Sequence, residues 1–128
     1  MKKIICCSIL IFMSYTAISQ TYICWREELA LINPSTGIYE PFHKTDMNSE
    51  AFFNDRVIRI NDADILLTKE SIASRNVTSD GTVTVYNVRN EKNKKLIAIV
   101  AEDKKGILKV SITQANIDVM AIYYIKNR

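Results

Sequence analysis

The stretch Ile107-Leu108-Lys109-Val110-Ser111-Ile112-Thr113 alternates apolar and polar side chains. Because successive side chains of a strand point to opposite sides of a sheet, Leu108, Val110 and Ile112 fall on one face. β-Branched residues dominate the stretch, and this composition together with the two-residue period favours a half-buried strand. Residues 107–113 are therefore predicted to form a strand, and the neighbouring strands can be placed relative to it.

A polar segment, Glu102-Asp103-Lys104-Lys105-Gly106, precedes this strand. Glycine tolerates a positive φ, so the segment predicts a tight turn back to residues 95–101. Folding the chain at this turn gives three pairs of apolar residues on a single face: Val100 with Leu108, Ala98 with Val110, and Leu96 with Ile112.

The segment Asn90-Glu91-Lys92-Asn93 predicts a second turn, which joins residues 82–88 to residues 95–101. Centring the hairpin there sets Val83 opposite Val100 and Val85 opposite Ala98. Both turns then assign the same core face to three strands, and a one-residue slip in either would reverse that assignment. We therefore expect one shared buried face: Val83, Val85, Ala98, Val100, Val110 and Ile112.

Further strands are predicted on both sides of this region. Turn signatures separate residues 22–32 from 38–42 and residues 56–60 from 65–69. Residues 119–125 form the last strand, whose register stays open because a connection of either five or six residues fits. About seven short strands without βαβ alternation predict an all-β antiparallel meander, either a small barrel or a two-layer sandwich.

Two segments have no unique interpretation. Residues 26–31 fit either a strand or one helical turn, because their apolar residues do not alternate. Residues 43–54 show no clear period at all, so a loop or a short helix is expected there.

The first 19 residues have the three-part layout of a cleavable signal peptide. Lys2 and Lys3 precede an apolar run over residues 4–13, and small residues at Ala17 and Ser19 predict cleavage before Gln20. The apolar run is too short to span a bilayer, which needs about 20 residues. The layout resembles the signals of small bacterial exported proteins. We therefore expect an export signal over residues 1–19 and a single domain over residues 20–128, periplasmic or extracellular, with no membrane span after cleavage.

The cysteines predict neither a disulfide framework nor a lipid anchor. Cys6 and Cys7 lie inside the apolar run, too early for lipidation, and Ile23 before Cys24 is too bulky for that modification. Cys24 is then the one cysteine of the mature chain, where it can make no internal disulfide or zinc site. The alternatives for Cys24 are an intermolecular disulfide or a nucleophilic role, and burial as a small apolar residue is favoured over both.

Composition and charge argue against a disordered chain and against a nucleic-acid partner. The chain is 48% hydrophobic with 3 glycines and 2 prolines, which argues against low complexity and broad disorder. Without Lys2 and Lys3, 15 basic residues face 14 acidic ones, so a nucleic-acid partner is not expected. The basic residues that cluster in sequence fall into two turns at opposite ends of one strand: Arg89, Lys92, Lys94, Lys95, Lys104 and Lys105.

Residues with catalytic or metal-binding chemistry are sparse. His43 is the single histidine, and as a general base it would need Glu40 or Asp46 to orient it. Asp62 and Asp64 resemble the start of a calcium loop, but Leu67 and Ala73 stand where the pattern needs Gly and Glu, so a hairpin turn is favoured. No catalytic residue, metal site or cofactor is therefore predicted.

The aromatic residues of the first half have two interpretations. They either line an apolar ligand cavity or cover the outer side of the sheet at Tyr86, Ile97 and Ile99, and packing is favoured because the chain is short. The residues are Trp25, Tyr39, Phe42, Phe52 and Phe53.

The sequence favours a small exported, non-catalytic binding domain. Strands that are apolar on both faces leave room for a groove or patch that takes an apolar ligand, a peptide or a protein partner. The alternative is a small hydrolase that uses His43 as its general base.

Overall fold

A computed structural model describes residues 20–114 and 118–128, which form eight strands and no helix. The predicted signal peptide, residues 1–19, lies outside the described residues. The strands are β1 (Gln20–Ile32), β2 (Tyr39–Phe53), β3 (Val57–Ile60), β4 (Ile65–Val77), β5 (Thr82–Arg89), β6 (Lys95–Asp103), β7 (Gly106–Thr113) and β8 (Val119–Asn127).

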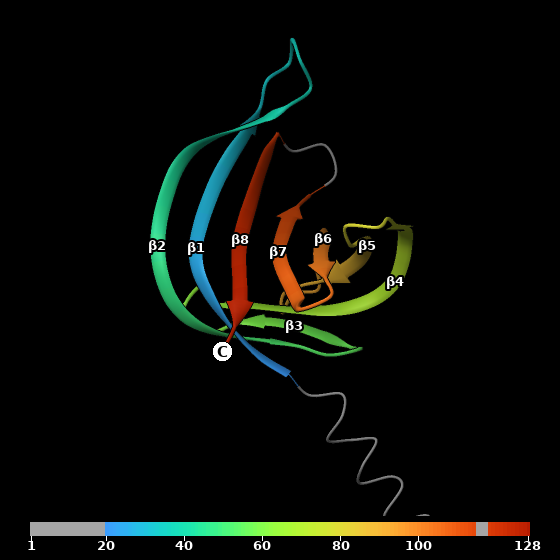
Figure 1. Cartoon of the computed structure of the whole chain (residues 1–128). Coiled ribbons are helices and arrows are strands. Elements are labelled where there is room, and N and C mark those ends of the chain that lie inside the picture. The colour runs from blue at the N-terminus through green and yellow to red at the C-terminus, as the bar shows by residue number, and fades with distance from the viewer. Residues whose placement is uncertain (1–19, 115–117) are drawn as a thin grey trace, which may run out of the picture.

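The eight strands close into one ring (Figure 1). Each strand pairs antiparallel with the next, and β1 pairs with both β2 and β8. The predicted all-β antiparallel meander is confirmed, with eight strands where about seven were expected. Because β1 and β8 are hydrogen-bonded to each other, the strands form a single closed sheet.

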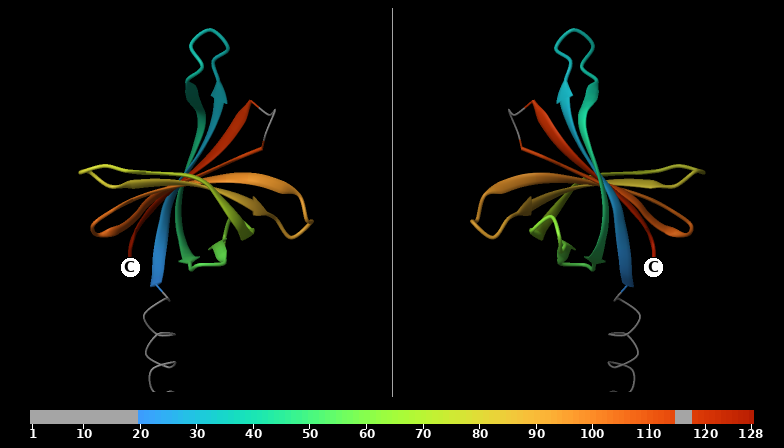
Figure 2. Two further views of the ribbon diagram at one scale, coloured as in Figure 1. Left: turned by 90° about the vertical axis from the view of Figure 1, so that its right-hand side faces the viewer. Right: turned by 90° about the vertical axis from the view of Figure 1, so that its left-hand side faces the viewer.

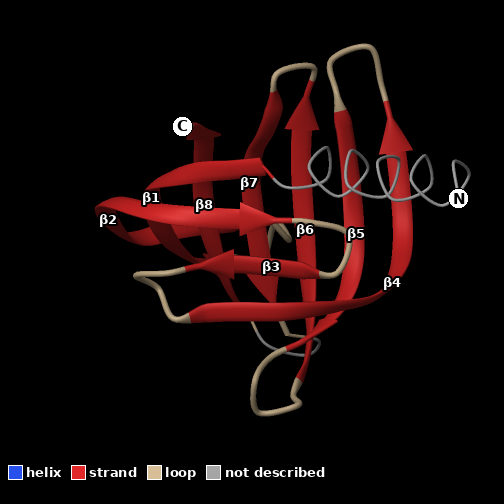
Figure 3. Ribbon diagram, turned by 90° about the horizontal axis from the view of Figure 1, so that it is seen from below, coloured by secondary structure: helices blue, strands red, loops and turns tan. Residues whose placement is uncertain are grey.

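The strands cross the molecule in two main directions. β2, β3 and the first half of β4 run from side to side in Figure 3, whereas β5, β6 and the second half of β4 run up and down in it. Figure 2 shows how the hairpins radiate from this crossing. β3 has only four residues, so both of its neighbours extend far beyond it.

The interior is filled by side chains from all eight strands. Strand residues that alternate with these point outward, which leaves Ile97 and Ile99 on the outer face of β6. The buried cluster consists of Tyr22, Cys24, Ala51, Phe53, Ile58, Ile60, Leu67, Val88, Ala98, Val100, Val110, Tyr123 and Ile125.

The predicted register of β5 against β6 is wrong by one residue. Val100 lies opposite Thr84, not Val83, so Val83 and Val85 point outward and Val83 is 42% exposed. The connection is one residue longer than predicted because Asn93 adopts a positive φ of 64°. A left-handed residue after a tight turn adds a position to a hairpin, and asparagine tolerates that conformation.

The predicted register of β6 against β7 is wrong by two residues, which keeps the core face. Val100 lies opposite Val110, because the pairing next to the turn, Asp103 with Gly106, is already shifted by one residue and the bulge between Ala101 and Glu102 adds a second. Leu108 falls beside this bulge and is 48% exposed. Four of the six predicted core residues therefore do face the interior: Ala98, Val100, Val110 and Ile112.

The structure also resolves the open segments. Residues 26–31 belong to β1, so the helical-turn alternative is wrong, and β2 continues to Phe53 where a loop or short helix was expected. Only the beginnings of β2 and β4 were predicted, and their full lengths could not be found by period because large parts of both strands are exposed on both faces. The last strand pairs Thr113 with Met120.

Candidate functional site

An apolar hollow opens between the β3–β4 and β5–β6 turns, and we call it the aliphatic pocket. Its volume is about 270 Å³. Five aliphatic side chains line it, namely Ile65, Leu66, Leu67, Leu96 and Ile112, together with four polar residues of the two turns, Asp64, Asn90, Glu91 and Lys92.

The floor of the aliphatic pocket is continuous with the core. Leu67 is buried, and Ile65, Leu96 and Ile112 are partly buried and packed against the core cluster. Apolar side chains that are held by the core on one side and open to the pocket on the other make a preformed surface. Such a surface is of the kind that takes apolar ligands.

The two turns at its mouth are held by local hydrogen bonds. The Asn90 side-chain oxygen accepts hydrogen bonds from the backbone amides of Lys92 at 3.0 Å and Lys94 at 2.9 Å. In the other turn, Asp64 has a φ of 53° and its amide donates to the Asn61 carbonyl. Asn and Asp favour such turns because they tolerate the left-handed conformation and bond their own backbone.

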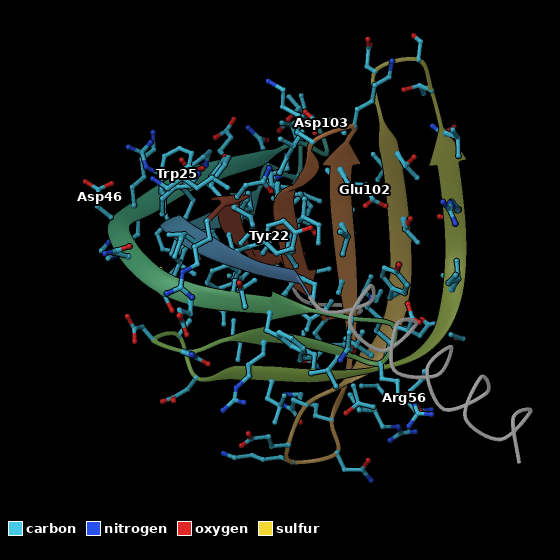
Figure 4. The ribbon with its side chains drawn as sticks, turned by 60° about the horizontal axis from the view of Figure 1, so that its bottom comes forward. Tyr22, Trp25, Asp46, Arg56, Glu102 and Asp103 are labelled. Carbon is cyan, nitrogen blue, oxygen red and sulfur yellow. The ribbon has the colours of Figure 1, made fainter. Side chains whose placement is uncertain are left out.

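A second pocket, which we call the end pocket, lies at the opposite ends of β5, β6 and β7. It has a volume of about 250 Å³, and its lining includes Tyr22, Phe53, Lys69, Tyr86 and Glu102. Figure 4 looks into this end, with Tyr22 in the opening and Glu102 on the side of β6. The end pocket mixes aromatic rings with charges, in contrast to the aliphatic pocket.

Lys69 is the cation of the end pocket. Its Nζ donates a 2.8 Å hydrogen bond to the Asn54 carbonyl and lies 4.3 Å from the centre of the Tyr86 ring. Burial lowers the pKa of Lys69, while the negative charges of Asp55 and Glu102 act in the opposite direction. Sequence patterning does not single out Lys69, because its side chain becomes half-buried only where β4 passes residues 54–56.

The residues of the hydrolase alternative do not meet. His43 is exposed on β2, and its Nε2 lies 3.1 Å from the Thr45 hydroxyl. Glu40 accepts a hydrogen bond from the Asn33 side chain, and an oxygen of Asp46 lies 3.4 Å from Arg26 Nε.

Cys24 is fully buried in the interior. Its thiol lies 3.6 Å from the Arg26 carbonyl and donates to it, and burial raises its pKa to about 11. The thiol therefore stays protonated near neutral pH, whereas nucleophilic cysteines act as thiolates.

The two aspartates of the rejected calcium pattern lie in the β3–β4 turn, as the hairpin interpretation predicted. The amide of Asp62 donates to the Ser49 hydroxyl at 2.9 Å, which ties the turn to β2. Within residues 20–114 and 118–128, no group of three or more His, Cys, Asp or Glu side chains is placed to hold a metal ion. The basic residues also divide between the two turns at opposite ends of β6.

The aromatic residues of the first half do not form one layer. Phe53 packs inside against Tyr22 with ring centres 5.3 Å apart, whereas Phe42 is exposed. Trp25 lies outside against Tyr124, with the Arg26 guanidinium 5.2 Å from its ring centre. The expectation that they cover Ile97 and Ile99 is not met.

A buried carboxylate on the outer surface of β1 was not predicted. Glu28 accepts a 3.1 Å hydrogen bond from the Tyr124 hydroxyl, and Arg26 and Lys44 lie 4.0 and 3.9 Å away. Burial, followed by the contact with Glu28, raises the pKa of Tyr124. The carboxylate thus has one hydrogen-bond donor and two cationic side chains close to it.

Comparisons with known proteins give no relative: no family model, curated protein or solved structure matches the chain. Among the described residues, no helix has the length and apolar character needed to cross a membrane.

Proposed function

We propose that this protein is an exported, non-catalytic binding domain that takes a small apolar ligand into the aliphatic pocket. The observation that carries the proposal is the row of aliphatic side chains that open to this pocket while packed on the core. On this proposal the closed ring is a small barrel with an open end, a shape in which ligand sites recur.

The size and chemistry of the pocket define the ligand class. An apolar cavity of roughly 150 Å³ can hold a benzene molecule, so about 270 Å³ suits a short alkyl chain or a ring with a substituent. Each methylene removed from water contributes about 0.8 kcal/mol, so the affinity should rise with the length of the alkyl chain until the pocket is filled. A polar head group would lie near Asn90, Glu91 and Lys92 at the mouth.

The export signal supports a location in the periplasm or outside the cell. Residues 1–19 carry the basic, apolar and small-residue parts of a cleavable signal. Intact-mass measurement of the exported protein tests this part of the proposal. Cleavage before Gln20 is expected, and retention of residues 1–19 would contradict it.

A filling substitution tests the pocket itself. We expect the fluorescent apolar probe N-phenyl-1-naphthylamine to bind the wild-type protein with saturable enhancement of its emission. Leu96→Trp and Ile112→Trp each place a large ring in the pocket and should weaken probe binding about tenfold or more. Leu108→Trp is the matched control, because Leu108 is exposed on β7 and does not line the pocket.

Three outcomes would contradict the proposal: no saturable binding by the wild type, equal binding by all three variants, or equal loss in Leu108→Trp. Circular dichroism melting of each variant shows whether a loss reflects the pocket rather than the fold.

A further inference from the structure

The second half of β4 is a free sheet edge. β4 pairs with β3 only over residues 65–68, whereas its pairing with β5 continues to Val77. No other described strand pairs with residues 70–77, which we call the free edge. This part of β4 is the outermost strand in Figures 3 and 4.

β2 also extends beyond β3, but its free part carries residues that block strand addition. Over residues 39–50, β2 pairs with β1 alone, and this segment contains Pro41, Lys44 and Asp46. Proline removes a backbone donor, and charged side chains discourage another strand from pairing. The free edge of β4 contains no proline; of its two charged residues Glu70 is paired with Arg89, which leaves Arg75 beside the aliphatic Ile72 and Val77.

Three side chains of the free edge point to the inner side of the sheet. Ile72 lies opposite Tyr86, which lines the end pocket, and Arg75 lies opposite Thr84, which is buried. Val77 lies opposite Thr82, two residues further along the same face.

These three side chains are exposed to solvent. Ile72 and Val77 are 56% and 67% exposed, which is high for aliphatic residues in a strand. Arg75 is exposed between them and makes no ion pair with another described residue. The inner row of the free edge is therefore apolar, cationic and apolar in turn.

Two bulges set the length of any added strand. Register shifts lie between Lys69 and Ser71 and between Ile72 and Ser74, which leaves residues 74–77 as the regular stretch. Bulges twist an edge and discourage long, flat pairing between identical strands. The edge is therefore suited to a short extended segment.

We propose that the free edge binds a short extended segment of a protein partner by strand addition, with an acidic side chain against Arg75 and apolar side chains beside it. An unpaired strand edge presents alternating N–H and C=O groups, which another extended chain matches group for group. The inner side chains of the bound segment lie beside Ile72, Arg75 and Val77. Contacts with these three side chains select which peptide sequences bind.

This site is separate from the aliphatic pocket. The free edge adjoins the end pocket through Tyr86, whereas the aliphatic pocket lies at the β5–β6 turn. Binding of N-phenyl-1-naphthylamine should be unchanged in Arg75→Glu, so failure of one proposal is distinguishable from failure of the other.

Selection from a random peptide library displayed on phage provides the probe. The library is panned on the exported protein, and each enriched peptide is synthesised with a fluorescent label for anisotropy titration. We expect enriched peptides to place an acidic residue between apolar residues at two-residue spacing. Arg75→Glu should weaken their binding about tenfold or more, and Ile72→Asp should do the same.

Matched controls lie on the outer face and on β3. Val83→Asp changes an exposed aliphatic residue on the outer side of β5, and Arg59→Glu reverses an exposed arginine of β3. Both should leave peptide binding unchanged. In hydrogen exchange, the bound peptide should protect amides within residues 72–77.

Several results would overturn the proposal. These are a library that yields no peptide sensitive to Arg75→Glu, equal losses in the control variants, or protection that appears on β2 or at the β5–β6 turn. Self-association of the purified protein that Arg75→Glu abolishes would also overturn it, because the occupant would then be a second copy of this chain.

Discussion

Val110 of β7 lies directly opposite Val100 of β6, and both side chains are buried in the interior of the ring. Val110→Ala should lower the free energy of unfolding by about 1–3 kcal/mol, because it deletes buried methyl groups and leaves a cavity. Lys109→Ala, one residue earlier and facing outward, should change it by no more than about 0.5 kcal/mol. Urea denaturation measures both, and equal losses would show that the inward face of β7 is assigned wrongly.

The β5 register makes a second prediction. Val88 is buried and Val83 is exposed on the outer face. Val88→Ala should therefore cost about 1–3 kcal/mol of unfolding free energy, and Val83→Ala less than about 0.5 kcal/mol. Urea denaturation measures the unfolding free energy of both variants. A larger loss at Val83 than at Val88 would restore the register that the sequence alone predicted.

The close approach of the β4–β5 turn to β6 makes Gly81 irreplaceable. A Cβ at residue 81 would collide with the Glu102 carbonyl oxygen, which belongs to the backbone and has little room to move. Gly81→Ala should lower the unfolding free energy by about 3 kcal/mol.

Gly37→Ala is the control for the glycine prediction. Gly37 also has a positive φ, at 73°, but nothing lies within 4 Å of an added Cβ. That substitution should cost only about 1 kcal/mol, the conformational part alone. Similar losses in the two variants would contradict the close approach at Gly81.

Cys24 predicts a loss of stability at alkaline pH. Burial raises its pKa from 9.0 to about 11, so between these values the unfolded chain releases the proton while the folded chain retains it. Unfolding is then favoured as pH rises above about 9, by up to about 2–3 kcal/mol.

Denaturation at pH about 8 and about 10.5 measures this effect against Cys24→Ala. The difference in unfolding free energy between wild type and variant should shrink at the higher pH. A difference in unfolding free energy that is the same at both pH values would contradict the raised pKa of Cys24. The comparison cancels the opposite contribution of Lys69, whose lowered pKa makes stability rise with pH.

The core strands were predictable because their period-two pattern is local, but their pairing was not. The existence of β5 and β7 follows from alternation, and that of β6 from its apolar run between two turn signatures. Their register depends on Asn93 in a left-handed conformation and on the bulge at Ala101 and Glu102. The left-handed residue and the bulge leave the hydrophobic pattern of the strands unchanged, so neither could be predicted from that pattern.

The candidate sites were less predictable than the fold. The aliphatic pocket joins residues from β4, β6 and β7 that are distant in sequence, and its leucines and isoleucines look like ordinary core residues. The free edge of β4 exists because β3 is only four residues long, which no property of residues 70–77 themselves indicates.

Methyl NMR during titration with 1-heptanol, a short alkyl chain with one hydroxyl, tests the apolar-ligand proposal most directly. The aliphatic pocket predicts saturable shifts of the methyl signals of Leu67, Leu96 and Ile112, with Val83 and Leu108 unchanged. The proposal is contradicted if these pocket methyls do not shift, or if the saturable shifts fall on Val100 and Ile107 at the end pocket.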